Sequence, residues 1–177
     1  KTGFEVFNKA IENGGAVKGL RGEGCGGFSR SEIDKLTVFV NKLGAKGLAY
    51  IALTPEGPKS PILKFLKEGE IKAIIERTGA KTGDMIFFAA DKADVALTVL
   101  GALRLELAEK LNLRKATDFK FVWITDFPLL EYDEKEKRYV ARHHPFTMPV
   151  ASDLDKLESD PAKVKAQAYD IVLNGVE

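Results

Sequence analysis

The chain has 177 residues, of which 45% are hydrophobic and 30% are charged, proportions that permit an ordinary core in one or two domains. Its 27 basic and 26 acidic residues leave a net charge of +1, which excludes bulk positive charge as a means of holding nucleic acid. The single cysteine, Cys25, excludes an intrachain disulfide and favours a reducing cytoplasm, and no apolar run approaches the roughly 18 residues of a membrane-spanning helix.

A glycine-rich tract at 14–27 follows a short apolar segment at the start of the chain. Within it, Gly22, Gly24 and Gly27 satisfy G-x-G-x-x-G, a pattern that lets the backbone approach a pyrophosphate in dinucleotide sites. Such a site also needs an acidic residue about 20 positions further on to hold the ribose, and residues 35–55 contain none. We therefore favour a flexible loop that binds no phosphate over an oxidoreductase site, and a titration with nicotinamide nucleotides would distinguish the two.

The first clear helix begins at a capping box, in which Ser29 is followed by Glu32 at the third position of the helix. Apolar residues then recur at helical spacing from Ile33 to Leu43, and Gly44 follows as a C-terminal cap. This pattern predicts a helix that buries one face.

Further elements are expected before residue 115. They are a strand at 48–54, two short helices at 61–78 broken at Gly69 with Ile71, Ile74 and Ile75 buried, a buried strand at 85–90, and a long helix at 93–111 with leucines at 100, 103, 107 and 111. We expect the helices at 29–43 and 93–111 to pack on one face of a sheet that contains both strands.

A polar joint at 114–118 separates these elements from the rest of the chain. We place a domain boundary near residue 116 and expect an α+β fold, with domains at 1–115 and 116–177. In the second domain we expect a strand at 119–124, a turn at 133–137 and a strand at 138–143, for which a hairpin is the simplest interpretation.

A closing helix is expected after this hairpin, because Pro161 suits the first helical position and Asp160 the N-cap. Val164, Ala168, Ile171 and Val172 would form its apolar face, and the Asn-Gly pair at 174–175 would end it.

The only histidines, His143 and His144, are adjacent. Neighbouring residues on a strand point to opposite faces, and a zinc site needs about three or four converging ligands, so we do not expect the pair to hold a metal. A histidine at a strand end is ordinarily a polar rim residue. The Pro-Phe-Thr sequence at 145–147 restrains the following loop, however, and an imidazole there can donate a charge-assisted hydrogen bond to a substrate carboxylate.

Two carboxylates, Asp170 and Glu177, lie near the end of the chain. Their spacing would suit one helix face, but the Asn-Gly pair would end a helix between them, so their geometry stays open. Surface carboxylates are the ordinary interpretation; the alternative is that their oxygens hold Mg²⁺ on phosphates.

Five segments of the chain resemble the bacterial aspartyl-tRNA synthetases. They are residues 121–128, 143–147 and 168–177 for the catalytic domain, and residues 44–51 and 83–90 for the family's insertion domain, called GAD. Taken in this order and spacing, they cover essentially the whole chain.

The resemblance implies a GAD-type insertion domain, a sheet with packed helices, followed by part of a class II catalytic domain, an antiparallel sheet flanked by helices. It implies a cytoplasmic homodimer that activates L-aspartate with ATP and Mg²⁺ and transfers the aspartyl group to the 3′ end of tRNA. By the same resemblance, His143 contacts the aspartate with His144 beside it, Glu177 binds ATP, and Asp170 joins Glu177 at Mg²⁺.

The chain also departs from the family pattern. Both of its ends resemble internal cuts, and it lacks the anticodon-binding barrel, the dimer-forming motif and the motifs whose arginines bind ATP. We therefore expect the 177-residue chain to be inactive and to hold no ATP or Mg²⁺ tightly. The missing dimer-forming motif is compatible with a monomer, and the sequence leaves the order of residues 148–177 open. The main rival interpretation is a stand-alone GAD module that binds tRNA or protein, as in subunits of tRNA-dependent amidotransferases. The segment at 143–147 and the stretch ending at Glu177 disfavour that rival, because a GAD module alone has no use for them.

Overall fold

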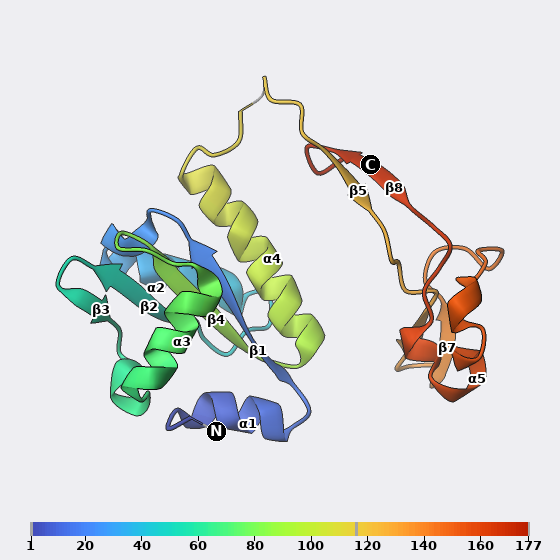
Figure 1. Ribbon diagram of the computed structural model, residues 1–177, viewed down its shortest axis with the longest axis horizontal. Coiled ribbons are helices and arrows are strands. Elements are labelled where there is room, and N and C mark those ends of the chain that lie inside the picture. Colours follow the sequence, from blue (N-terminus) through green and yellow to red (C-terminus); the bar gives the residue numbers. More distant parts are fainter. Residues whose placement is uncertain (1, 116, 177) are drawn as a thin grey trace. The chain divides into compact units, whose positions relative to one another are not determined.

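The computed structural model describes residues 2–115 and 117–176 and divides after Arg114 into two units (Figure 1). Each unit is described by itself. Within the described residues, no helix has the length and apolar character that crossing a bilayer requires.

The first unit is a four-stranded sheet with helices on both faces. Its strands lie in the order β1-β4-β2-β3 and are antiparallel at every pairing. Short 3-10 turns occur at Cys25–Gly27 and Leu63–Phe65. The helices and strands are α1 (Glu5–Glu12), β1 (Ala16–Gly22), α2 (Arg30–Asn41), β2 (Ala49–Thr54), β3 (Gly57–Lys59), α3 (Glu68–Thr78), β4 (Met85–Asp91) and α4 (Ala93–Lys110).

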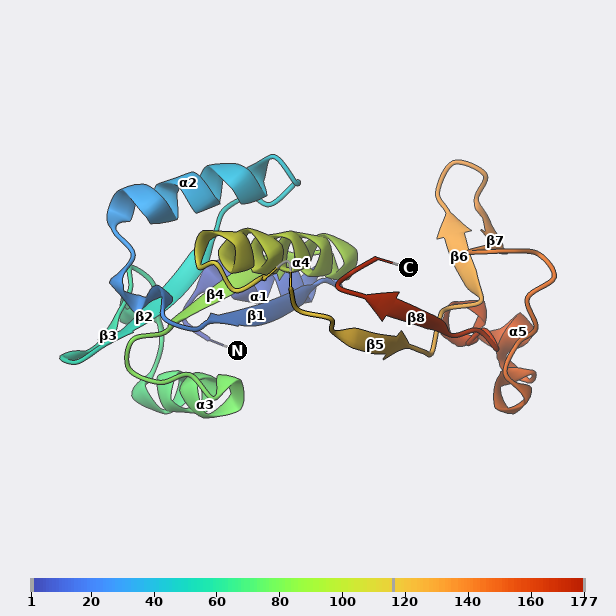
Figure 2. The same cartoon turned by 90° about the horizontal axis from the view of Figure 1, so that it is seen from above.

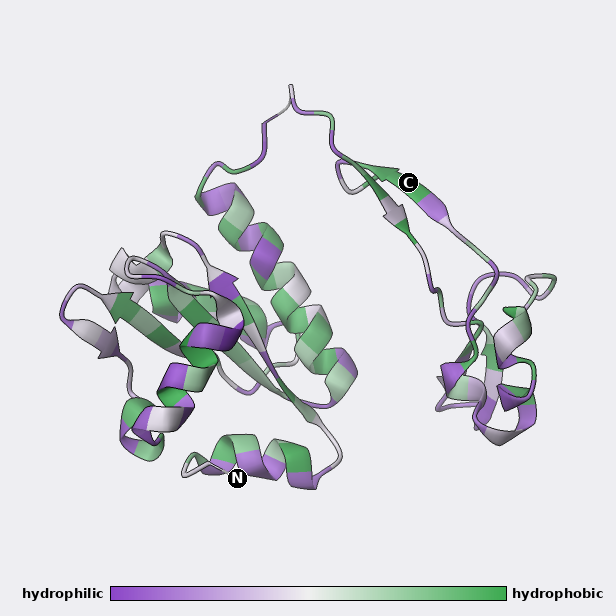
Figure 3. Cartoon of the chain, viewed as in Figure 1, coloured by the Kyte–Doolittle hydropathy of each residue, from purple (hydrophilic) through white to green (hydrophobic). Residues whose placement is uncertain are grey.

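Strand β4 lies between the two hydrophobic clusters of this unit, because successive side chains of a strand point to opposite faces. Met85, Phe87 and Ala89 belong to the cluster formed with α2 and α4. Ile86 and Phe88 belong to the cluster formed with α1 and α3. Figure 2 shows α2 and α4 on one side of the sheet and α3 on the other, and Figure 3 shows the hydrophobic character of the central strands. The prediction that α2 and α4 share one face of the sheet is therefore confirmed.

The glycine-rich tract is not a flexible loop throughout, so that prediction is wrong for residues 16–22. These residues form β1, which pairs with β4 along its whole length. The glycines suit close packing rather than mobility: a Cβ at Gly22 would lie 2.9 Å from both the Phe87 ring and the Cys25 sulfur. A glycine inside a strand is typical of a close approach of this kind.

The predicted break at Gly69 is also wrong, because α3 runs without interruption from Glu68 to Thr78. Gly69 falls in the first turn, where the backbone N–H groups have no partner within the helix in any case. The Glu70 carboxylate accepts a hydrogen bond from the backbone of Lys67 at 2.7 Å and caps this end. The isoleucines of α3 are half-buried rather than buried, and they pack against the cluster on the α1 side of the sheet.

The capping box of α2 is confirmed. The Ser29 hydroxyl accepts a hydrogen bond from the backbone of Glu32 at 3.3 Å, and the Glu32 carboxylate accepts one from the backbone of Ser29 at 2.9 Å. The bond from the Ser29 backbone to the Glu32 carboxylate, with bonds from the Ser29 hydroxyl and Lys110, lowers the pKa of Glu32 to about 2.

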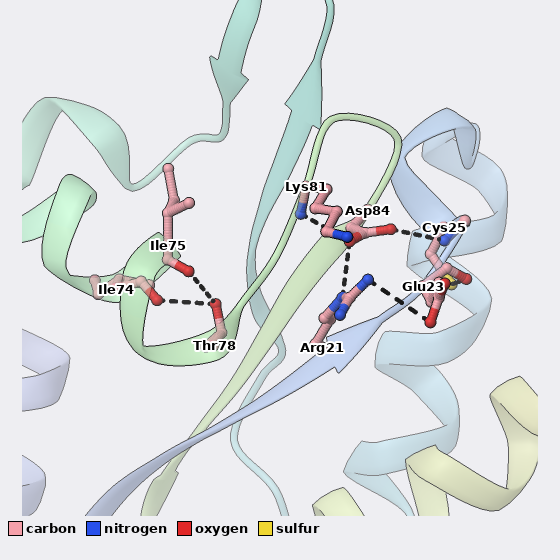
Figure 4. A network of polar contacts seen from close by, with 9 residues as sticks. Arg21, Glu23, Cys25, Ile74, Ile75, Thr78, Lys81 and Asp84 are labelled. Atoms are coloured by element: carbon pink, nitrogen blue, oxygen red, sulfur yellow. Dashed lines mark hydrogen bonds and ion pairs between the residues drawn. The ribbon is translucent and has the colours of Figure 1, made fainter.

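Asp84 fastens the loop after β1 to the start of β4 (Figure 4). Its buried carboxylate accepts hydrogen bonds from Nε of Arg21 at 2.8 Å and from the backbone of Gly24 at 3.0 Å and Lys81 at 2.8 Å. Burial alone would raise the pKa of Asp84, but the bonds from Lys81, Gly24 and Arg21 outweigh it and lower the pKa. The neighbouring Cys25 is fully buried, and burial followed by the charges of Asp84 and Glu32 raises the pKa of its thiol to about 11.

The second unit contains two separate two-stranded ribbons, in which β5 pairs with β8 and β6 with β7. Its elements are β5 (Phe121–Ile124), β6 (Leu130–Asp133), β7 (Arg138–Ala141), the one-turn helix α5 (Lys156–Ser159) and β8 (Asp170–Leu173), with 3-10 turns at Ala151–Asp153 and Pro161–Lys163.

The hairpin predicted between the strands at 119–124 and 138–143 is wrong in its partners, because β7 pairs with β6 instead. The turn itself lies where it was predicted. The Asp133 carboxylate accepts hydrogen bonds from the backbone of Lys135 at 2.8 Å and Glu136 at 3.0 Å, a local turn that aspartate favours. Such a tight turn joins strands that adjoin it, so β6 takes the place that we assigned to β5.

The predicted closing helix is also wrong. A single 3-10 turn follows Asp160, and Asp170–Leu173 forms a strand opposite β5. Asn174 and Gly175 have φ values of 52° and 86°, and Leu173 and Val176 exchange backbone hydrogen bonds of 2.8 and 2.9 Å. These features are those of a two-residue hairpin turn, for which Asn-Gly is a strong signal. The pair therefore ends a strand and not a helix.

The small core of the second unit surrounds an extended segment at 164–167. Val164 and Ala166 are buried. The segment is hydrogen-bonded to 127–129 on one side and to 148–150 on the other. By contrast, all four side chains of β5, which are large and apolar, are exposed, as is Ile171 of β8.

Candidate substrate site

His143 lies just beyond the end of β7 and is exposed. Its ring meets the ring of Phe127 edge-on, with centroids 4.9 Å apart and planes at 82°. The backbone carbonyl of Phe127 accepts a hydrogen bond of 2.7 Å from Ala166, so the small core holds the ring that His143 contacts. Neither imidazole nitrogen of His143 is engaged by a described residue, and both are free to bind a ligand.

His144 is part of a turn. Its backbone carbonyl accepts a hydrogen bond from Thr147 at 3.0 Å, and its Nδ1 accepts one from the backbone of Phe146 at 3.3 Å. The ring centroids of His144 and Phe146 lie 4.9 Å apart. With Nδ1 as an acceptor, the neutral imidazole carries its proton on Nε2, which can donate to a ligand.

Asp170 is the first residue of β8, opposite Ile124 of β5, and is half-buried. Its carboxylate makes no hydrogen bond or ion pair with the residues at 2–115 and 117–176. No hydrogen bond or ion pair joins it to either histidine within that same part of the chain. Glu177, which the sequence pairs with Asp170, lies outside the described residues.

The described carboxylates alone do not form a magnesium site. No group of three or more His, Cys, Asp or Glu side chains in the described ranges could hold a metal ion. Mg²⁺ is commonly bound through one or two carboxylates together with substrate phosphates and waters. Asp170 has the right chemistry for one such ligand, but by itself it does not fit a resident ion.

Four residues that sequence reasoning did not single out support this region. Nζ of Lys165 donates to Asp126 at 2.8 Å, next to Phe127, and this bond raises the pKa of Lys165. Buried Asp153 accepts hydrogen bonds from Nζ of Lys156 at 2.6 Å and from the backbone of Lys165 at 3.1 Å, which lower its pKa. Asp126 and Lys165 are 39 positions apart, so no local signal could have revealed the pair.

Comparison with known proteins identifies both parts of the chain. The model of the GAD domain family matches residues 7–100. The aspartate–tRNA(Asp/Asn) ligase of Heliobacterium modesticaldum is 54% identical over 174 residues, which cover 98% of this chain and 29% of that protein. That of Moorella thermoacetica is 53% identical over 175 residues, or 99% of this chain and 29% of that protein.

The aspartate–tRNA ligase of Clostridium perfringens is 56% identical over 176 residues, which are 99% of this chain and 30% of that protein. The chain thus spans 29–30% of the length of these curated relatives. The resemblance inferred from five short segments is confirmed by identity along nearly the whole chain. The chain belongs to the bacterial-type aspartate–tRNA ligases, of which it represents a portion that carries the GAD domain.

Proposed function

We propose that the chain serves within a longer ligase that activates L-aspartate with ATP and transfers the aspartyl group to the 3′ end of tRNA. The observation that carries this proposal is the identity of 53–56% to aspartate–tRNA ligases over 98–99% of the chain. Because the chain spans 29–30% of those proteins, the activity belongs to the whole ligase, which acts in the cytoplasm as a homodimer.

His143 is the proposed contact for the substrate aspartate. Its exposed imidazole has no partner in the described part of the chain, and the Phe127 ring restrains its orientation. A protonated or neutral N–H of this ring can donate to a carboxylate, and such a charge-assisted bond is stronger than a neutral one. His144 adds a second donor through Nε2, because Nδ1 already accepts from the turn.

Asp170 and Glu177 are the proposed ligands on the ATP side, where Mg²⁺ would neutralise charge on the phosphates when bound. The carboxylate of Asp170 is available for this role because it has no partner among the described residues. Two carboxylates without cationic partners would repel ATP, so these residues act only together with other parts of the ligase. For this reason the 177-residue chain alone forms no aspartyl-adenylate and retains neither ATP nor Mg²⁺.

Amino-acid-dependent exchange of pyrophosphate into ATP, measured on the complete ligase, tests the proposal. Exchange should occur with L-aspartate and be absent with L-asparagine or L-glutamate at equal concentration, and the aspartyl group should then appear on tRNA. Exchange with another amino acid only, or none at all, would refute the assignment. The rival interpretation, a stand-alone GAD module, has no observation in its favour, because the similarity to ligases extends well past residue 100.

A further inference from the structure

Strand β1 presents an open edge of the first unit's sheet. It stands at the end of the strand order and pairs only with β4 (Figure 1). Apart from that pairing, residues 16–22 make no backbone hydrogen bond with any other segment among the described residues. Lys18 and Gly19, at the middle of the strand, are exposed. An open edge of this length is a template for a further strand, and proteins usually protect it.

A groove of about 630 Å³ runs along this edge. Its walls come from α1 and α3, and five consecutive residues of β1, from Val17 to Arg21, line it. The walls are apolar where they face the strand: Ile11 of α1 is 57% exposed, and Ile74 of α3 is half-buried. Phe88 of β4 also lines the groove. An open backbone edge beside an apolar groove is the arrangement by which domains bind an extended peptide as an added strand.

Gly19 deepens this groove. It lies opposite Phe88 in the β1–β4 register, so both face the α1 and α3 side of the sheet. A Cβ at Gly19 would make ordinary contact with the Phe88 ring at 3.6 Å. The backbone therefore does not require glycine at this position for lack of space. Its absent side chain leaves room above Phe88 that a side chain of an added strand can fill.

The rim of the groove carries three basic residues, Lys18, Arg21 and Arg77, and one acidic residue, Glu12. Lys18 and Arg77 form no ion pair with any residue in the described ranges, whereas Arg21 is held by Asp84 at 2.8 Å and Glu23 at 3.6 Å. Lys18 points to the opposite face from Val17 and Gly19 because side chains alternate along a strand. An added strand would thus meet apolar walls on one face and a free ammonium group on the other.

We propose that the β1 edge and its groove bind an extended peptide segment of a partner protein, in which apolar and acidic side chains alternate. The apolar side chains enter the groove over Gly19 and Phe88. The acidic side chains meet Lys18 on the other face. A second copy of the chain is a poorer occupant, since antiparallel pairing of two β1 strands would bring their basic side chains along one ribbon, and like charges destabilise neighbouring strands.

A fluorescein-labelled peptide of alternating valine and glutamate tests this proposal on the 177-residue chain, with fluorescence anisotropy as the readout. Saturable binding is expected, together with slower amide hydrogen exchange in residues 17–21. Gly19→Val should weaken binding about tenfold or more by filling the groove. Lys18→Glu should weaken it about three- to tenfold, because a surface attraction becomes a repulsion.

Two variants serve as matched controls. Lys72→Glu makes the same kind of charge change on α3 outside the groove, and Gly101→Ala fills open space on α4. Both should bind the peptide as the unaltered chain does, and thermal unfolding of every variant checks that the fold is kept. A peptide with lysine in place of glutamate should not bind.

Three outcomes would overturn the proposal. The first is peptide binding that Gly19→Val leaves unchanged in a folded variant. The second is a single-stranded RNA oligonucleotide that displaces the peptide and itself slows exchange at residues 17–21, which would make the groove a nucleic-acid site. The third is concentration-dependent self-association of the chain with protection of β1, which would make the edge a contact between two copies.

Discussion

Strands β4 and β5 are both apolar runs, yet they differ in how far their side chains are buried. Five residues of β4, from Met85 to Ala89, are buried, whereas all four residues of β5 are exposed. Strand β4 has a neighbour on each side and helices over both faces. Strand β5 has β8 alone. An apolar run thus becomes core only when other elements cover it, and an exposed run of this kind is typical of a surface that another part of a protein covers.

The largest expected effect on the free energy of unfolding comes from removing a buried side chain of β4. Phe87→Ala removes a fully buried ring and should lower the free energy of unfolding by about 3–5 kcal/mol. Phe121→Ala, at a side chain 64% exposed, should change it by less than about 0.5 kcal/mol. Urea unfolding followed by far-UV circular dichroism, which reports the helices of the first unit, measures both.

The same urea titration can distinguish the unfolding of the two units. Trp123, the only tryptophan, lies in β5, so its fluorescence reports the second unit alone. We expect its transition at lower urea than the dichroism transition, because the second unit has few buried side chains. Coincident transitions, shifted together by Phe87→Ala, would show that the units unfold as one. They would contradict the expected difference in stability between the units.

A smaller effect is expected at Asp84, the buried carboxylate of the first unit. Asp84→Asn removes charge-assisted hydrogen bonds and should cost about 1.5–3 kcal/mol at neutral pH. The exposed Asp34→Asn, which breaks a surface pair with Arg30, should cost less than about 1 kcal/mol.

The sign of the pH dependence follows from the lowered pKa of Asp84. A lowered carboxyl pKa stabilises the fold above the unfolded-state value of about 3.9 and loses that contribution as pH falls toward the folded-state value. Stability measured from pH 6 downward should therefore decline less steeply below about pH 4 in Asp84→Asn than in the unaltered chain. Equal slopes would show that the Asp84 carboxylate makes no net contribution.

The exposed surface of the second unit should matter for catalysis rather than for folding. In the complete ligase, His143→Ala should weaken aspartate binding by about 1–3 kcal/mol if the ring donates a charge-assisted bond. Glu177→Gln should slow adenylate formation more than it weakens aspartate binding, because we propose Glu177 as a ligand on the ATP side. The KM for aspartate and the rate of pyrophosphate exchange measure the two effects. Lys72→Glu in the first unit is the control and should change neither, and an unchanged KM in His143→Ala would remove the role assigned to that residue.

The smallest expected effect compares two helix starts. Ser29→Ala removes a capping box and should cost about 1 kcal/mol. Asp160→Ala should cost about 0.5 kcal/mol or less, because this residue makes no side-chain cap and only an exposed pair with Lys163. Thermal unfolding with dichroism and Trp123 fluorescence resolves the two. A larger loss at Asp160 would mean that the turn it precedes is more important to the second unit than its burial indicates.

The elements that could be predicted from the sequence are those with a distinctive pattern within their own residues. Strand β4 is a continuous apolar run, α4 repeats leucines at helical spacing, and Ser29 with Glu32 marks a helix start locally. Strand β1 escaped prediction because its glycines resemble a loop and its pairing with β4 joins residues far apart in the chain. The Asn-Gly pair at 174–175 was interpreted as a helix end, although the partner strand β5 makes it a hairpin turn.

The candidate site shows the same limit. His143, His144 and Asp170 were singled out by family resemblance, and the environments of His143 and Asp170 depend on long-range contacts. The edge-on contact with Phe127, and the bond between Asp126 and Lys165 beside it, join segments that no spacing rule connects. What the sequence could supply was the identity of the reactive groups, and what it could not supply was the support that orients them.

The burial of Cys25 gives the first unit a built-in reporter of its own opening. The thiol has no exposed surface and a pKa near 11, so a thiol-modifying reagent can reach its thiolate only when the surrounding core separates. The rate of modification in native buffer then follows the population of the opened state rather than the chemistry of the thiol. Since Cys25 is the only cysteine, every modified molecule records one opening of the core between β1, β4 and α2, and none arises from the second unit.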